Sequence, residues 1–323
     1  MAKRRRIRWD RVIISAAILI AMIFLLGSCI HSCTRRSAEE SSSGSPLEPL
    51  GSGTGTQLSD TQTSRSETTS TTPALPADYE EKSFSAADIY KGTLVLVNAQ
   101  NPSHLSREEL DLAQVVYASD RPDGAYQLSY PAYTFLNRTA LTQFNRLMTA
   151  FYSVTQNTDI LFNYGYLESG KEKANPDSPT GLSLQLHLHN QTTGSFGYIT
   201  NASPYSWIYE HMDSYGFVVR YPEDKSGETG EKGGFSAIRY VGVPHAAYMA
   251  QNNLCLEEYL DLLKNSYSFG QGMLEFTAAE QKYRIYYVPA SKTGETAVPV
   301  PTGLAYEVSG NNEDGFVVTV FLK

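Results

Sequence analysis

The chain has 323 residues, of which 41% are hydrophobic, 19% charged and 11% aromatic, and its net charge is −8. This length allows one large domain or two small ones, and the apolar share is sufficient for a real core. Residues 1–36 hold eight Lys or Arg against one acid, so the rest of the chain carries −15. An acidic body lacks the cations that displace counterions from a phosphate backbone, which excludes nucleic-acid binding.

An almost unbroken apolar run covers residues 12–30 and follows the basic segment 1–11. About 20 apolar residues span a bilayer core, and a basic flank stays in the cytosol by the positive-inside rule. We therefore expect a single-pass transmembrane signal-anchor helix in the cell membrane, with an extracytoplasmic body. The residues Leu26-Gly27-Ser28-Cys29 also resemble a bacterial lipoprotein signal, in which Cys29 would be cleaved and lipidated. Both alternatives tether the protein to the outer face of a membrane.

Residues 31–83 are dominated by Ser, Thr, Gly, Pro and Glu and contain few residues that could form a core. This composition predicts a disordered stalk, and about 45 such residues span roughly 35–40 Å root-mean-square. In the body, Cys255 is the only cysteine and lies between two leucines. We expect it to be a small buried hydrophobe.

The folded body is expected to begin near Phe84 and to mix helices with short strands. Apolar residues at three- and four-residue steps predict an amphipathic helix over 139–152. Strict alternation over 181–189 predicts a strand with leucines on one face. The other expected elements are a strand at 93–97, a capped short helix at 106–109, and helices at 206–215 and 254–263. The pattern indicates an α+β domain over residues 84–266, with a small central antiparallel sheet and flanking helices.

The character of the chain changes again from residue 267 onward. Four strand-like segments occur at 273–276, 283–288, 304–308 and 315–321, separated by turn-rich stretches. They predict a small β-appendage over residues 267–323. Its tyrosines at 283, 286 and 287 could form a sugar- or peptide-binding face, although aromatic residues in strands more often fill or edge a sheet.

Several landmarks occur in a specific order between Leu94 and Lys264. They are Leu94-Val-Leu-Val-Asn98 with Asn101-Pro102, Thr180-Gly181-Leu182, Trp207, Tyr215-Gly-Phe-Val-Val-Arg-Tyr-Pro222, Thr229-Gly230, Arg239-Tyr-Val-Gly242, His245-Ala246 and Leu256-Glu-Glu-Tyr-Leu260. In this order the chain resembles the VanY-like zinc D,D-carboxypeptidases, which are LAS-type peptidases that trim D-alanine from peptidoglycan stem peptides. The resemblance covers most of the body and implies a peptidase-like fold.

The resemblance also implies where that family's chemistry would lie. In the family, two His and one Asp hold a zinc ion whose bound water becomes acidic, and a Glu accepts the proton. Counted from the landmarks, the ligand positions fall on Ser178, Gln185 and Ala237, and the base falls on Gly234. Ser and Gln are poor neutral ligands, and Ala and Gly offer no donor. The substitutions predict a pseudoenzyme for which no cofactor is expected.

The substrate-binding segment departs from the family as well. The S-G-Y-R segment of the family resembles Tyr164-Gly165-Tyr166-Leu167 here, and leucine cannot form a bidentate pair with a carboxylate. We expect Arg220 to pair with a local acid, Asp213 or Glu223. The candidates for lining a retained peptide-binding cleft are Tyr166, Gln185, His187, Arg220, Tyr221 and Arg239.

Other residues could rebuild a metal site. His187 and His189 lie on one strand face, roughly 6.5–7 Å apart at a two-residue step, and Glu231 could serve as a shifted base. We expect instead that both imidazoles lie on a solvated face and that Glu231 lies in a flexible loop. Two further histidines could supply a third ligand, but His211 is expected at the surface and His245 is expected to be structural.

Three functions are compatible with these observations. The leading hypothesis is a catalytically inactive family member, anchored in the membrane, that binds peptidoglycan stem peptides or a cell-wall enzyme partner. The first alternative is an active zinc D,D-carboxypeptidase with the shifted ligands His187 and Glu231. The second alternative is a structural spacer of the envelope, which needs no cleft.

Overall fold

The computed structural model describes residues 75–171 and 175–323. The predicted segments 1–11 and 12–30, Cys29, and residues 31–74 of the predicted stalk lie outside these ranges. Within the described part of the chain, no helix is both long enough and apolar enough to cross a bilayer.

The central sheet has six strands in the order β3-β5-β6-β9-β8, with β7 paired to β6. All neighbours are antiparallel except β3 and β5, which are parallel. The strands are β3 (Gln127–Leu128), β5 (Ile160–Tyr164), β6 (Ser183–Asn190), β7 (Ser195–Tyr198), β8 (Phe217–Val219) and β9 (Ala237–Tyr240). The strand predicted from alternation is β6, and its inward residues Leu184 and Leu186 are fully buried. The predicted α+β class is therefore confirmed for this part of the chain.

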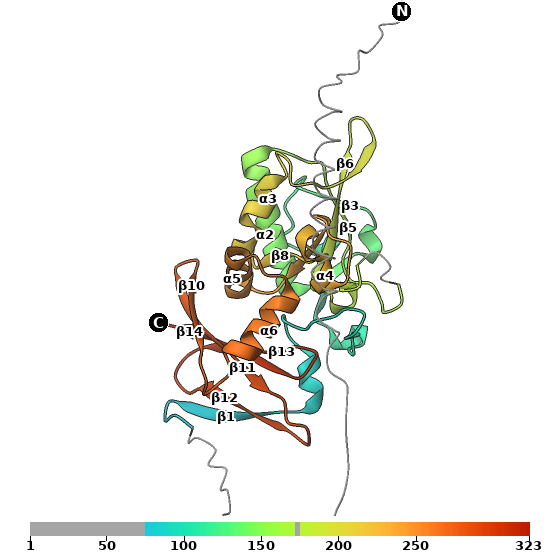
Figure 1. Cartoon of the computed structure of the whole chain (residues 1–323). Helices are drawn as coiled ribbons and strands as arrows, with labels where there is room; N and C mark the ends of the chain where they lie inside the picture. Colours follow the sequence, from blue (N-terminus) through green and yellow to red (C-terminus); the bar gives the residue numbers. More distant parts are fainter. Residues whose placement is uncertain (1–74, 172–174) are drawn as a thin grey trace, which may run out of the picture. The chain divides into compact units, whose positions relative to one another are not determined.

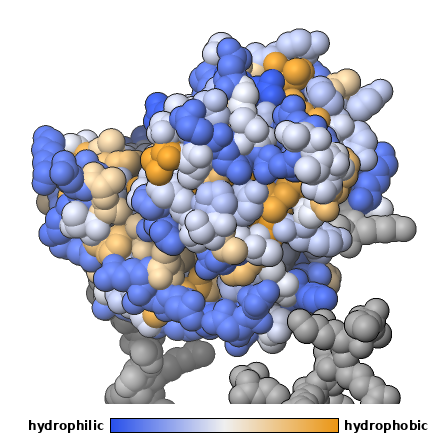
Figure 2. Space-filling view, turned by 90° about the horizontal axis from the view of Figure 1, so that it is seen from above, coloured by the Kyte–Doolittle hydropathy of each residue, from blue (hydrophilic) through white to orange (hydrophobic). Residues whose placement is uncertain are grey.

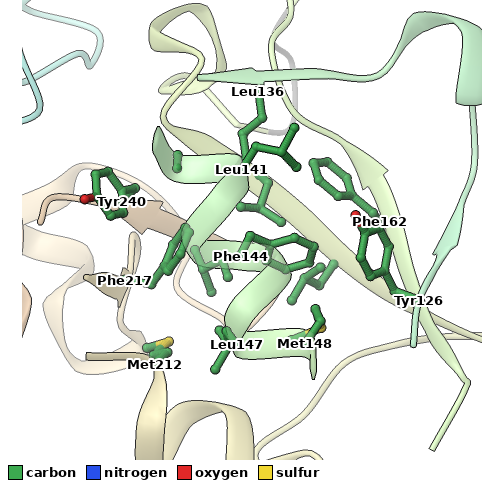
Figure 3. Packing of buried hydrophobic residues seen from close by; sticks show 14 of the residues in the cluster. Tyr126, Leu136, Leu141, Phe144, Leu147, Met148, Phe162, Met212, Phe217 and Tyr240 are labelled. Carbon is green, nitrogen blue, oxygen red and sulfur yellow. The ribbon is translucent and has the colours of Figure 1, made fainter. Parts of the chain in front are cut away.

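The helix α2 (Arg138–Thr155) packs on this sheet and confirms the helix predicted over 139–152. It begins because the Asn137 side chain accepts hydrogen bonds from the first free backbone N–H groups. Its Phe144 ring lies between Phe162 of β5, at a centroid distance of 5.3 Å, and Phe217 of β8, at 6.4 Å (Figure 3). The main core therefore lies between α2 and the leucine face of β6.

Four further helices lie after β7 in the described part of the chain. They are α3 (Ser206–His211), α4 (Ser226–Thr229), α5 (Val243–Asn252) and α6 (Leu256–Ser266). The predicted helix over 206–215 is α3 continued by a 3-10 turn, and it stops at Gly216, whose φ of 83° favours glycine. Cys255 caps α6 and is fully buried, as the sequence predicted.

The C-terminal strands form a second sheet in the order β10-β11-β14-β13 (Figure 1). They are β10 (Leu274–Ala278), β11 (Gln281–Pro289), β13 (Tyr306–Gly310) and β14 (Gly315–Leu322). All four predicted strands are confirmed. The tyrosines at 283, 286 and 287 are buried among them, so they fill the sheet and do not form a binding face.

Another strand pair was not predicted. β1 (Tyr79–Phe84) pairs with β12 (Thr296–Pro301) in antiparallel register. The assignment of residues up to 83 to the stalk is therefore wrong for β1, whose middle residues are charged and exposed and so disguise a strand. β12 contains two prolines, which argue against a strand in sequence analysis although edge positions tolerate them.

The predicted boundary between residues 266 and 267 is crossed by one hydrophobic cluster. Leu260 and Leu263 of α6 pack with Ile285 and Val317 of the C-terminal sheet. The C-terminal segment therefore shares a core with the helices and is not a separate appendage.

The strand predicted at 93–97 is wrong. This segment is buried, but its backbone N–H groups bond irregularly: Leu94 donates to Ser309 Oγ at 2.9 Å and Leu96 donates to the Asn311 carbonyl at 3.0 Å. The remaining elements are short: β2 (Leu112–Gln114), β4 (Phe135–Asn137), and 3-10 helices at Ala86–Tyr90, Arg107–Glu109, Val115–Tyr117, Pro131–Tyr133, Ser178–Thr180 and Glu223–Lys225. The capping box predicted at Ser106 is present at the second of these 3-10 helices.

Candidate functional site

A pocket of about 560 Å³ opens beside the middle of β6. Its lining includes Gln185 of β6, Ala237 of β9, Tyr198, Tyr221, Glu223 and the loop at 232–236. We call it the Gln185 pocket. The face seen in Figure 2 is mostly hydrophilic, with hydrophobic patches separated from one another.

Three of the four positions that the sequence analysis predicts to correspond to the family's ligands and base come together in this pocket. Gln185 and Ala237 are direct partners in the β6–β9 register, and Gly234 lines the same pocket. Ser178 lies in a 3-10 helix and does not line it. The Ser178 hydroxyl and the Gln185 Oε1 are both buried and have no protein hydrogen-bond partner. The antiparallel pairing of two central strands is what joins positions 52 residues apart in sequence.

The donor set of the Gln185 pocket does not fit the zinc site that the resemblance implies. A catalytic zinc needs three protein ligands drawn from His, Cys and carboxylates. Glu223 is the only one of these residue types among the residues that line the pocket. Over the whole described part of the chain, no three His, Cys, Asp or Glu side chains are grouped closely enough to hold a metal ion.

The two strand histidines have other contacts. The His187 ring meets the Tyr198 ring edge-on at 5.2 Å, and its Nε2 is buried without a partner. Burial lowers the pKa of His187, which favours the neutral imidazole. His189 Nδ1 lies 2.6 Å from Gln127 Oε1, and its ring stacks on Phe196 at 4.2 Å. Both histidines are partly buried, so the predicted solvated face is confirmed only in part.

Glu231, the candidate shifted base, does not line the Gln185 pocket. It lines an adjoining depression with Glu223, Lys232 and Gly233, so the two hollows share one wall. At that wall Gly233 approaches the backbone of Glu223 so closely that a β-carbon would lie 2.3 Å from its Cα. Gly234, by contrast, has open space where a β-carbon would be.

The two arginines proposed for the cleft are instead buried in an ion network behind it. Arg220 forms a bidentate pair with Glu257, at 2.8 and 3.1 Å, and its Nε lies 3.7 Å from Asp177 Oδ1. Arg239 pairs with the same Asp177 oxygen. The expectation that Arg220 pairs with Asp213 or Glu223 is therefore wrong. Neither arginine lines the Gln185 pocket, because each guanidinium is held by acids that the fold brings inward.

Tyr221 connects the network to the pocket. It lines the Gln185 pocket, and its hydroxyl donates to Asn175 Oδ1 and accepts from the Asp177 backbone N–H, both at 3.2 Å. Burial raises the pKa of this hydroxyl, so it stays protonated. Tyr166 is buried beside Arg107 and is not part of this pocket. The ion network thus positions one wall of the pocket.

Sequence reasoning missed Asp177 and Glu257. In the sequence, the one hint at Asp177 is its position directly before Ser178. Glu257 lies in the first turn of a helix, where an acidic residue is normally exposed to solvent, so nothing in the sequence indicates that it is an ion-pair partner. The structural role predicted for His245 is confirmed, whereas the surface position predicted for His211 is met only in part. His245 is structural, with Nδ1 2.7 Å from the Tyr259 hydroxyl and Nε2 3.0 Å from the Thr319 hydroxyl. His211, which is only partly buried, stacks on Trp207.

No protein-family model matches the chain. A D-alanyl-D-alanine carboxypeptidase of Enterococcus faecium is 32% identical over 256 residues, which are 75% of this chain and 79% of that protein. A D-alanyl-D-alanine carboxypeptidase of Enterococcus faecalis is 29% identical over 196 residues, covering 55% of this chain and 69% of the relative.

Among solved structures, the vancomycin-resistance D,D-dipeptidase VanXYg, in complex with a D-Ala-D-Ala phosphinate analogue, superposes with a TM-score of 0.61. It is 25% identical and covers 76% of this chain and 99% of its own. The predicted resemblance is thereby confirmed in both sequence and fold. The chain belongs to the family of VanY/VanX-type D-alanyl-D-alanine carboxypeptidases.

Proposed function

We propose that this member of the family binds the D-Ala-D-Ala end of peptidoglycan stem peptides in the Gln185 pocket without hydrolysing it. One observation carries the proposal. The pocket has a volume of about 560 Å³, but the side chains at the predicted ligand and base positions within it are an amide, a methyl group and a hydrogen. A volume that suits a dipeptide is thus combined with a lining in which Glu223 is the one carboxylate and no histidine or cysteine is present.

The pocket offers groups that suit such an end. Gln185 Oε1 is a buried acceptor with no protein partner, which a peptide N–H could satisfy. Lys232 is the only cation among the lining residues, and it is exposed at the pocket wall. We assign it to the terminal carboxylate, a role that falls to arginine in the related enzymes according to the resemblance. Ala237 and Phe235 provide apolar surface for the alanine methyl groups.

The proposal includes a location at the outer face of the cell membrane. The support is the sequence of residues 12–30, which is apolar and follows a basic segment. A protein held there would meet stem peptides in the wall, or an enzyme that acts on them. Fractionation of cells, with protease added from outside, tests this location, because an exposed body is digested while the cell remains intact.

The central experiment uses the full chain and two ligands, acetylated Lys-D-Ala-D-Ala with a free carboxylate and the same peptide as its C-terminal amide. Calorimetry should show saturable binding of the acid and roughly threefold weaker binding of the amide, the size of one exposed ion pair worth about 0.7 kcal/mol. Lys232→Met should weaken binding of the acid to the level of the amide and leave the amide unchanged. Lys292→Met, at an exposed turn outside the pocket, is the matched control.

Turnover and metal content are measured on the same samples. We expect no release of D-alanine above the blank after incubation with zinc, and no stoichiometric zinc after desalting. Release of D-alanine together with about one tightly held zinc per chain would overturn the proposal in favour of an active enzyme. Absence of binding by both peptides would overturn it in favour of a spacer.

A further inference from the structure

A second hollow lies on the same sheet face as the Gln185 pocket. Side chains alternate along β6, so Gln185, His187 and His189 share one face while the leucines face the core. In the register with β7, His187 lies opposite Tyr198 and His189 lies opposite Phe196. Directly opposed residues lie on the same face, which places both aromatic rings beside the histidines. The β6–β7 hairpin projects beyond the rest of the sheet at the upper right of Figure 1.

The hollow has a volume of about 370 Å³ and includes Gln127, Ser129, Tyr130, His189 and Phe196 in its lining. We call it the Phe196 hollow. Its rings are unusually open to solvent: Phe196 is 70% exposed and Tyr130 is 60% exposed. Tyr198, which is 74% exposed, lines the Gln185 pocket and so stands between the two hollows. Exposed apolar surface rimmed by polar residues is a feature of ligand-binding grooves.

The lining of the Phe196 hollow indicates the kind of ligand. None of its lining residues is Asp, Glu, Lys or Arg. Flat aromatic faces beside amide, hydroxyl and imidazole groups suit an uncharged ring that has an apolar face and a polar edge. A pyranose sugar has this character, because its axial C–H bonds form an apolar face and its hydroxyl and acetamido groups form the rim.

The spacing of the two hollows favours one particular sugar. Gln185 and His189 are four residues apart on β6, which corresponds to about 13 Å. An extended peptide of five residues spans at most roughly 17 Å. A stem peptide whose D-Ala-D-Ala end occupies the Gln185 pocket can therefore reach the Phe196 hollow with its other end, where peptidoglycan carries an N-acetylated amino sugar.

We propose that the Phe196 hollow binds the N-acetylated amino sugar that carries the stem peptide, so that the protein recognises a sugar-linked stem in preference to the peptide alone. This inference rests on the proposed function of the Gln185 pocket. The middle of the peptide then lies against the ring of Tyr198, between the two hollows. No covalent step is involved.

The test compares binding of a free pentapeptide with binding of the same pentapeptide attached to its disaccharide, using the full chain. The sugar-linked ligand should bind about tenfold more tightly, as expected for one stacked ring worth about 1–1.5 kcal/mol. Phe196→Ala and Tyr130→Ala should each remove most of this advantage and leave the affinity for the free pentapeptide unchanged. Both side chains are exposed, so neither change is expected to unfold the protein.

Val154→Ala is the matched control, because Val154 is 64% exposed but lies on α2, which covers the opposite face of the sheet. It should leave both affinities unchanged. Equal affinity for the two ligands, with normal binding of the pentapeptide, would overturn the sugar site and leave the proposed function intact. Failure of both ligands to bind would overturn both.

Discussion

Replacing Asp177 with asparagine tests the buried ion network behind the pocket. The network is balanced, with two guanidinium groups, from Arg220 and Arg239, and two carboxylates, from Asp177 and Glu257. Both arginine side chains and that of Asp177 are fully buried. Asparagine keeps the shape of Asp177 but removes its charge. One positive charge then remains without a counterion in the interior.

The expected loss is large. Removing one partner of a buried pair costs about 3–5 kcal/mol, because the other charge is left desolvated and unpaired. Arg239 would retain only neutral acceptors, which are the amide oxygen at position 177 and the backbone carbonyls of Tyr240, Thr93 and Val95 at 2.9 to 3.0 Å. With about 2–4 °C per kcal/mol for a domain of this size, the melting temperature should fall by roughly 6–20 °C.

Urea unfolding followed by circular dichroism measures this difference. The matched control is Glu275→Gln, which breaks a partly exposed pair with Arg284 at 2.9 Å. This control should cost less than about 1 kcal/mol. If Asp177→Asn costs no more than the control, the reasoning is refuted, because neutral acceptors would then be sufficient to hold the buried guanidinium.

Three further predictions concern other parts of the molecule. Gly233→Ala should lower the free energy of unfolding in urea by about 1–3 kcal/mol, because the added methyl group overpacks against Glu223. Gly234→Ala, where there is open space, should have no effect. Equal effects of the two changes would contradict the close approach at Gly233. Burial lowers the pKa of His245 from 6.5 to about 3, so the unfolded state binds more protons below pH 6.5. The contribution of His245 to the free energy of unfolding is complete above pH 6.5 and decreases by up to about 1.4 kcal/mol per unit of pH below it. The His245→Gln variant should therefore show a smaller decrease in the free energy of unfolding between pH 7.5 and pH 5 than the unchanged protein. A fragment of residues 85–323 should be less stable than one of residues 75–323 by roughly 3 kcal/mol, because it lacks the rings of Tyr79 and Phe84, which pack in the C-terminal core. Equal denaturation midpoints would show that β1 does not contribute to stability.

Binding without turnover would make this protein a receptor within a family of hydrolases. A pocket that holds the D-Ala-D-Ala end and a neighbouring hollow for the sugar would select stems still attached to glycan. The predicted stalk, with a reach of roughly 35–40 Å, would then set how far from the membrane such stems are met.

Local sequence patterns predicted the elements whose partners are near in the chain or whose periodicity is strong. The alternation over 181–189 and the helical spacing over 139–152 both appear in the structure as expected. β1 and β12 could not be predicted, because they are more than 200 residues apart and each depends on the other for its backbone hydrogen bonds. Residues 93–97 have the composition of a strand, but the backbone beside them forms no regular ladder.

The candidate site shows the same difference between what local sequence patterns predict and what depends on tertiary contacts. The sequence by itself determined which face of β6 carries Gln185, His187 and His189, because side chains of a strand must alternate, and it determined the family through an ordered set of landmarks. Only the tertiary structure decided that Gln185, Ala237 and Gly234 share a pocket with Tyr198, that Arg220 and Arg239 lie outside it, and that Phe196 lines a second hollow. The physical reason is that buried charges require partners that the local sequence does not specify. Asp177 meets Arg239 across 62 residues, and strand pairing makes that contact possible.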